Sequence, residues 1–448
     1  MPSGDSTVEL SRRRLLALWG GATGLGLAGG RLYGRFSNGG DCDPTPLTAA
    51  PTEWPSPHSD RGNTRSVPAA SAPTGPLVER WHRAFEIRED ARPVVANGRV
   101  FLATGNRAAE VEFVRAYDIR DGRSDWEVRF RNDERSTSPV AMGDSVFHAT
   151  TTEESGTVVT ALAAADGSER WTRAVGEREN PTIAAGLVHL TEYVGHDGER
   201  VYALDAATGE RCWERTLSRS VRGDPAVTGG RLVYNVGTEG ELLALDARTG
   251  AEAWRGDVSE YFHPNNDAPD SAITDAVRGR IVADADRVLV TTFGGRLLAL
   301  DAASGDVQWT TTSSRTALVE RDGRTHAPAW FTAGALSDGV LLAIESRHLE
   351  NADAMWAIDT ETGATRWRFE PTSPELLSLS LPTIAGQKAY VCEYQRVRGS
   401  TRLLRFDLKT GERLGAHDIG EHGASGPVLA DETVVVADGG GVTTLRGD

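Results

Sequence analysis

Two groups of polar residues in this chain have the types and spacing that could do chemistry. The first group is His263, Asn265, Asp267 and Asp270, in a stretch rich in Pro and Asn. Oxygen ligands of this kind suit a hard cation such as Ca²⁺. The spacing matches no named calcium loop, and the same composition is typical of a surface turn. A metal site and an ordinary turn both remain as interpretations of this stretch.

The second group is expected around one rim of a central channel and is the candidate ligand- or cofactor-binding site. Its members are His326, Trp330, Glu345, Arg347, Arg222 and Asp224. His326, Glu345 and Arg347 could together form a polar pocket, because they lie near the ends of neighbouring predicted strands. The alternative is a set of solvated charges, since a histidine becomes a ligand or a switch only when its neighbours orient it.

No catalytic residue is assigned. The sequence shows no GxSxG, HExxH, phosphate-binding-loop or EF-hand motif.

The elements that must position these residues repeat along the chain. The pattern is Ala-Leu-Asp-x-x-Thr-Gly followed by Trp, and its clear copies end at Trp213, Trp254, Trp309 and Trp367. Weaker copies end at Trp126 and Trp171, and a seventh has Leu414 in place of Trp. The Asp can accept hydrogen bonds within a turn, the Gly can adopt a left-handed conformation, and the Trp offers a large apolar surface. Each copy therefore predicts a tight hairpin.

A second hairpin precedes each copy, as in residues 225–234 and 427–436. The unit is therefore four antiparallel strands, which we call A to D, recurring about every 40 to 60 residues. The last unit ends after strand C, and Leu77–Trp81 has the pattern of the missing strand D. The prediction is an all-β fold over residues 77–448: an eight-bladed β-propeller of four-stranded antiparallel blades, with its ring closed by the N-terminal strand.

The repeated motif resembles the PQQ-like repeat of quinoprotein alcohol dehydrogenases and of the outer-membrane assembly lipoprotein BamB. The resemblance covers residues 77–448 and implies the propeller fold. For the dehydrogenases it would also imply PQQ with Ca²⁺ in the funnel, beside a disulfide between adjacent cysteines. The cysteines here are Cys42, Cys212 and Cys392, and no two are adjacent. We expect no disulfide framework, with Cys212 and Cys392 as buried apolar residues.

The N-terminal region indicates export. Residues 11–16 (Ser-Arg-Arg-Arg-Leu-Leu) resemble a twin-arginine signal, followed by a short apolar stretch, so residues 1–30 are predicted to be a signal segment. Residues 31–76 are predicted to be a Pro-, Ser- and Thr-rich linker. We expect an extracellular or cell-surface protein and leave membrane tethering through the N-terminal segment open.

Composition narrows the choice of partners. The net charge of −16 disfavours binding to nucleic acid or to a broad anionic membrane surface. Lysine occurs only at Lys388 and Lys409, so nearly all 48 basic residues are arginines. This pattern is similar to that of proteins from salt-loving archaea, although a GC-rich genome also favours arginine.

The predicted function is that of a binding protein. In each blade the A–B and C–D turns are short and regular, whereas the B–C and D–A connections vary, and variable loops on a rigid scaffold usually carry binding. We expect a non-catalytic, monomeric scaffold without a cofactor that binds a protein or a small ligand on the B–C/D–A face. The alternative is a PQQ- and metal-dependent oxidoreductase that uses the central funnel, so the question of enzymatic activity stays open.

Overall fold

The computed structural model shows nearly all of its regular structure as β-strands. It describes residues 7–9, 37–38, 42–85, 92–106, 111–131, 137–152, 156–175, 181–193, 198–262, 276–313, 319–321, 324–326, 329–347, 352–371, 377–420, 425–438 and 440–448. The chain forms two compact units, and each is described by itself. The first unit comprises residues 1–49, 91–220 and 247–250, and the second comprises residues 50–90, 221–246 and 251–448.

The first unit holds blades one to three, in each of which four antiparallel strands follow one another in the order A-B-C-D; one further short strand extends the sheet of blade one and another that of blade three. Their strands are β5 (Val94–Ala96), β6 (Arg99–Asn106), β7 (Val111–Asp118) and β8 (Ser124–Arg131); β9 (Val140–Met142), β10 (Ser145–Thr152), β11 (Gly156–Ala163) and β12 (Glu169–Val175); and β13 (Thr182–Ala184), β14 (Leu187–Tyr193), β15 (Glu199–Asp205) and β16 (Arg211–Leu217).

The second unit holds blades four to eight. The strands of blades four to six are β17 (Val221–Thr228), β18 (Arg231–Val236), β19 (Glu241–Asp246) and β20 (Glu252–Asp257); β21 (Val277–Ala283), β22 (Arg287–Thr292), β23 (Arg296–Asp301) and β24 (Val307–Thr312); and β27 (Trp330–Ser337), β28 (Val340–Arg347), β29 (Ala352–Asp359) and β30 (Thr365–Phe369). Blade seven comprises β32 (Thr383–Ala385), β33 (Lys388–Gln395), β34 (Ser400–Asp407) and β35 (Arg413–Gly420), and blade eight begins with β36 (Val428–Ala430), β37 (Thr433–Asp438) and β38 (Gly441–Gly447).

Blade eight is completed by strand β4 (Leu77–Ala84) from the other end of the propeller sequence. It pairs antiparallel with β38, and Trp81 lies opposite Thr444. The predicted closure by the N-terminal strand is therefore confirmed, as is the eight-bladed β-propeller of four-stranded antiparallel blades.

A few short elements lie outside the blade pattern. They are β1 (Thr7–Glu9), β2 (Ser37–Asn38), β3 (Ser66–Val67), β25 (Val319–Arg321), β26 (Arg324–His326), β31 (Leu377–Leu379) and the 3₁₀ turns η2 (Ala69–Ser71) and η5 (Ser259–Tyr261). Among the described residues, no helix has the length and hydrophobicity needed to cross a membrane.

Within the second unit, the repeated motif joins neighbouring blades, as blades four and five show. In blade five, Asp301 accepts hydrogen bonds from the backbone N–H groups of residues 303 and 304 at 2.9 and 2.8 Å, which shapes the C–D turn. Trp254 of blade four donates its indole N–H to the Ala302 carbonyl at 3.0 Å. Its ring lies against Gly305, where a Cβ would come within 2.5 Å of the ring. Because Gly305 also has a φ of +81°, this position favours glycine for two reasons. The motif thus encodes packing between neighbouring blades.

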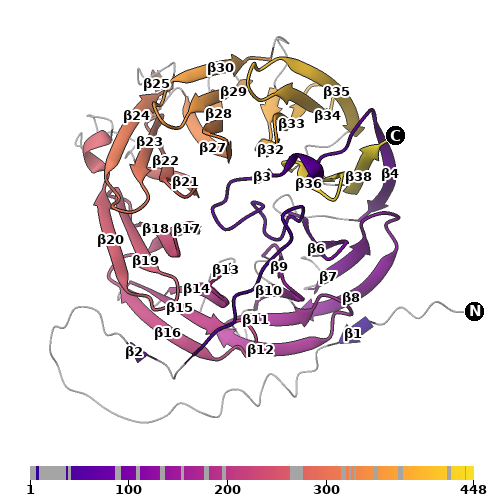
Figure 1. Cartoon of the computed structure of the whole chain (residues 1–448), viewed down its shortest axis with the longest axis vertical. Coiled ribbons are helices and arrows are strands. Elements are labelled where there is room, and N and C mark those ends of the chain that lie inside the picture. Colours follow the sequence, from indigo (N-terminus) through magenta and orange to yellow (C-terminus); the bar gives the residue numbers. More distant parts are fainter. Residues whose placement is uncertain are drawn as a thin grey trace, which may run out of the picture. The chain divides into compact units, whose positions relative to one another are not determined.

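Part of the segment that the sequence predicts to be a linker is packed, with most of residues 54–67 buried. In the second unit, β3 pairs parallel with β32, and Figure 1 shows the two strands side by side. The backbone carbonyls of Arg61, Gly62 and Thr64 accept hydrogen bonds from the A strands of blades four, five and six in turn. The Arg65 side chain is buried and donates to the carbonyls of Pro382 and Pro427 at 2.9 and 3.0 Å. Residues 61–67 therefore line the A strands of four blades of this unit.

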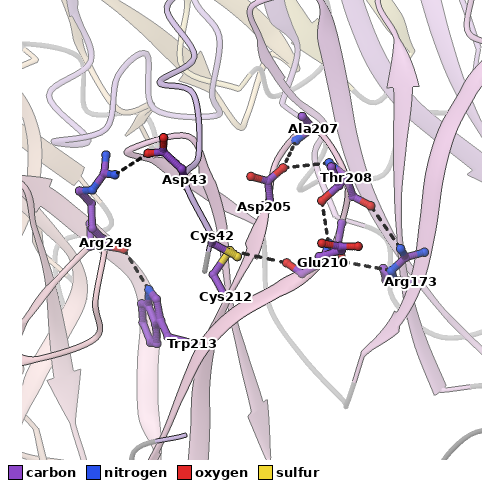
Figure 2. The surroundings of a disulfide bond; sticks show 12 residues. Cys42, Asp43, Arg173, Asp205, Ala207, Thr208, Glu210, Cys212, Trp213 and Arg248 are labelled. Atoms are coloured by element: carbon purple, nitrogen blue, oxygen red, sulfur yellow. Dashed lines mark hydrogen bonds and ion pairs between the residues drawn. A yellow bond between two sulfur atoms is a disulfide. The ribbon is translucent and has the colours of Figure 1, made fainter. Parts of the chain in front are cut away.

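In the first unit the same segment is held by a disulfide. Cys42 is bonded to Cys212 on β16, with a Cα–Cα distance of 5.5 Å, and Figure 2 shows the bond beside Trp213. Asp43, the next residue, lies 3.5 Å from Arg248 in an ion pair. Our expectation that the cysteines form no disulfide was therefore wrong. The two residues are 170 positions apart, and only the folded chain brings them together.

Candidate functional site

Several predicted site residues fall on parts of the chain that carry no structural description. His263, Asn265, Asp267 and Asp270 lie outside the described residues, and so does the His326 side chain, although its backbone belongs to β26. Among the described residues, no group of three or more His, Cys, Asp or Glu side chains is arranged to hold a metal ion. Both candidates stay predictions.

The structure brings Glu345 and Arg347 together in blade six. Glu345 is fully buried, and one of its carboxylate oxygens lies 3.0 Å from Nε of Arg347. The same oxygen accepts a hydrogen bond from the indole N–H of Trp356 at 3.3 Å and lies 3.4 Å from Arg368. Glu370 then pairs with both arginines, at 2.7 Å from Arg347. We call these four charged residues and Trp356 the Glu345 cluster.

In the Glu345 cluster two carboxylates face two guanidinium groups, so the charges of these four residues offset one another. A buried carboxylate with several donors is already satisfied and has little reason to bind another group. We therefore interpret the cluster as a stabilising contact within blade six rather than as a pocket. Glu345 and Arg347 lie next to each other, and both also contact other members of the cluster. Their part in ligand binding stays a prediction.

Trp330 belongs to a different arrangement, at the start of β27. Its ring lies under the guanidinium of Arg278 from β21, with the guanidinium carbon 4.1 Å from the ring centroid. Phe293, in the B–C turn of blade five, contacts the same guanidinium at 5.2 Å. Both are cation–π contacts, in which the electron-rich ring faces attract the positive charge. We call Arg278, Phe293 and Trp330 the Arg278 stack.

Among the described residues, the charge of the Arg278 stack meets no carboxylate. The Arg278 side chain is half-buried and makes no ion pair with any of these residues. Its Nη1 atom is buried without a hydrogen-bond partner. Burial lowers the pKa of Arg278 from its ordinary value, because removing the charge from water disfavours the protonated form. An uncompensated guanidinium of this kind can bind an anion.

Arg222 lies in the equivalent position on the neighbouring A strand. Arg222 lies opposite Asn235 in the strand pairing of blade four, and the register shifts just after it, where Gly223 has a positive φ. Arg278 is likewise followed by a register shift and by Gly279 with a positive φ. The Asn235 amide donates to the Val277 carbonyl at 3.4 Å, which ties the two strand starts together. Arg222 is exposed, whereas Asp224 is half-buried and already engages another group of the chain.

Arg278 and Phe293 were missed in the sequence. One signal could have found Arg278, because Val-Arg-Gly occurs at residues 221–223 and again at 277–279. Phe293 carries no such signal, since a single aromatic residue in a Gly-containing turn is common.

Exposed apolar side chains mark the B–C turns. Among the described residues, the large hydrophobic side chains that are well exposed are Tyr193, Phe293, Val397 and Leu414. The first three lie at the B–C connections of blades three, five and seven, where strand B ends. Leu414 instead lies on strand D of blade seven, one residue before Gly415, which pairs with Arg405 as Trp367 pairs with Ala357 in blade six. The prediction that Leu414 replaces the Trp was therefore one residue out. Exposed apolar groups on variable turns are typical of interaction surfaces.

A family model described as outer membrane protein assembly factor BamB matches residues 61–186, 154–316 and 264–413, which together are more than half of the chain. The chain belongs to this BamB family. The match begins within the packed N-terminal segment and runs through blades one to seven.

Two relatives show how much of the chain is similar in sequence to known proteins. The outer membrane protein assembly factor BamB of Xanthomonas campestris is 30% identical over 371 residues, covering 79% of this chain and 81% of that protein. A serine/threonine-protein kinase, AfsK of Streptomyces coelicolor, is 31% identical over 189 residues, or 42% of this chain. The match to the kinase spans only 18% of the kinase.

A solved structure shows that the fold alone does not decide the function. The quinohemoprotein alcohol dehydrogenase of Pseudomonas putida HK5 superposes with a TM-score of 0.60 at 15% identity, covering 88% of this chain and 80% of the enzyme. An assembly factor and a dehydrogenase thus share one architecture, so the site must decide between them.

The cysteines of this BamB-family chain do not fit the quinoprotein site that the repeat resemblance implies. That site has a disulfide between adjacent cysteines, whereas here Cys42 is bonded to Cys212 at a sequence separation of 170. The remaining Cys392 is buried, and burial raises the pKa of its thiol to about 12. We therefore derive no reaction through PQQ.

Proposed function

We propose that this BamB-family chain is an exported, non-catalytic β-propeller scaffold that binds a partner through its B–C and D–A connections. The observation that carries the proposal is the placement of Tyr193, Phe293 and Val397, the exposed apolar side chains on B–C turns. The C–D turns differ, because their Asp, Gly and Trp residues are already used in packing between blades. A protein is the favoured kind of partner, since the relatives of this family are named as assembly factors.

Export through a twin-arginine route and a cell-surface location belong to the same proposal. The Cys42–Cys212 disulfide supports them, because disulfides form and persist mainly in oxidising compartments outside the cytosol. A monomeric state, a membrane tether and a salt-loving origin stay predictions.

Photo-crosslinking from matched positions tests the proposal. A photoreactive amino acid at Phe293 or Val397 would report on B–C turns, and the same amino acid at Ser304 or Lys409 would report on the C–D turns of the same two blades. In the exporting cell, we expect a specific cross-linked product from Phe293 and Val397 but not from Ser304 and Lys409. Equal cross-linking from both sets, or products from the C–D turns alone, would contradict the proposal.

A further inference from the structure

Within the described residues, the guanidinium of the Arg278 stack has no carboxylate beside it. The chain has 64 acidic and 48 basic residues, so carboxylates are plentiful. Neighbouring arginines use them or use backbone carbonyls: Arg347 lies 3.0 Å from Glu345, and Arg280 donates to the Ala333 carbonyl at 3.2 Å. Arg278 makes no such bond in the described part of the chain, and its Nη1 is buried and unpartnered. Nη1 itself is closed to solvent, but the half-buried side chain leaves the rest of the guanidinium accessible, where an acceptor from outside can bind the uncompensated charge.

The two rings prepare Arg278 for a planar anion. Phe293 and Trp330 contact the guanidinium at 5.2 and 4.1 Å and restrict its orientation. Because Nη1 is buried, the edge of the guanidinium that can face the two oxygens of a carboxylate is the one formed by Nε and Nη2. Less side-chain freedom then has to be lost on binding.

The surroundings favour a carboxylate that belongs to a peptide. Phe293 is 42% exposed, so an apolar side chain can pack beside the cation. Arg222, exposed on the adjacent A strand, adds a second positive charge near the first. A ligand with carboxylates next to apolar groups would match both features.

We propose that the Arg278 stack, together with Arg222, is a carboxylate-binding site for an acidic, partly apolar peptide segment of a partner protein. The site deepens the proposed function and rests on it, since Phe293 lies on the same B–C turn that the scaffold would present to its partner.

The test is peptide binding to the full folded chain, followed by fluorescence anisotropy. The probe is a labelled peptide of alternating Glu and Leu with an amidated C-terminus, and its counterpart has Gln in place of Glu. The variants are Arg278→Gln and Arg278→Lys. The matched control is Arg211→Gln, because Arg211 also stacks on a ring, that of Tyr202 at 4.8 Å, but is already paired with Glu214.

We expect saturable binding of the Glu peptide to the wild type and much weaker binding of the Gln peptide. Arg278→Gln should weaken Glu-peptide binding about tenfold or more, and Arg278→Lys should weaken it less, since the charge remains but the fork is lost. Arg211→Gln should bind like the wild type. Thermal unfolding of each variant confirms that loss of binding is not loss of fold.

Other outcomes would overturn the site. Equal binding by the wild type and Arg278→Gln would do so, as would equal binding of the Glu and Gln peptides. Binding of inorganic phosphate or free acetate without binding of the Glu peptide would mean a small-anion site instead. If Arg278→Gln changes nothing while cross-links from Phe293 and Val397 persist, the carboxylate site fails and the scaffold function stands. Without those cross-links, the scaffold function itself fails.

Discussion

Blades five and six of this chain each hold an arginine over a tryptophan, and the two arginines differ in what balances their charge. Arg368 lies 4.6 Å from the ring centroid of Trp356, and Arg278 lies 4.1 Å from that of Trp330. Arg368 also pairs with Glu345 and Glu370, whereas Arg278 has no ion pair in the described residues. The same arginine–tryptophan stack can therefore stabilise the fold where carboxylates neutralise the arginine. Where no carboxylate is present, it can bind an anion.

The largest expected loss of stability comes from removing an arginine from the Glu345 cluster. Arg347→Ala should destabilise the protein by about 3–5 kcal/mol, because it leaves the fully buried Glu345 with an incomplete set of donors. Urea unfolding and the melting temperature measure the loss. A destabilisation below about 1 kcal/mol would mean that the cluster behaves like exposed ion pairs.

Removing one neutral donor from the same carboxylate should have a smaller effect. Trp356→Phe deletes the indole N–H that lies 3.3 Å from Glu345, and a hydrogen bond to a charged group contributes about 1.5–3 kcal/mol. Trp330→Phe is the matched control, since a ring remains beside Arg278 and no buried carboxylate is involved. Equal losses of stability in the two variants would contradict a special role for the Glu345 cluster.

Removal of Arg278 should change stability little. Arg278→Ala loses two cation–π contacts of about 0.5–1 kcal/mol each but also removes a buried donor without a partner, which offsets that loss. We expect a net change within about 1 kcal/mol by urea unfolding. A loss as large as that of Arg347→Ala would show that Arg278 is structural and would remove the contrast between the two arginines.

The smallest effect concerns Asp353, which lies near the Glu345 cluster on β29. Burial raises the pKa of Asp353, although the hydrogen bond from the Leu379 N–H at 2.9 Å and the nearby arginines act in the opposite direction. The fold thus favours the protonated acid, so this contribution to stability is present below the unfolded pKa of about 3.9 and is lost as the pH rises through the folded pKa.

The melting temperature of Asp353→Asn should therefore rise relative to that of the wild type as the pH increases from about 4 towards neutrality. The exposed Glu361→Gln is the control. A difference between Asp353→Asn and the wild type that stays constant across this pH range would show that the pKa of Asp353 is not raised.

Much of the fold could be predicted because its information is local and periodic. In the C–D turns of blades three, five, six and seven, an Asp accepts hydrogen bonds from the backbone N–H groups two and three residues ahead. The Trp of blade four packs on the corresponding turn of blade five. Because these contacts recur in successive blades, the residue types that make them recur along the sequence. That repeat predicted both the four-stranded blade and the closing strand at residues 77–84.

The candidate site could be predicted only in part. Glu345 and Arg347 are two residues apart on one strand, so their proximity follows from the sequence. Arg278, Phe293 and Trp330 come from three separate segments, and no local pattern relates them. For the same reason the spacing of Cys42 and Cys212 did not reveal their bond.

The sequence by itself determined the type of blade, the number of blades and the strand that closes the last one, because turn chemistry and alternating apolar residues act over short distances. Only the tertiary structure decided which charges are neutralised. Whether an arginine meets a carboxylate or is left between two rings depends on which distant segments fold against it, as Arg368 and Arg278 show.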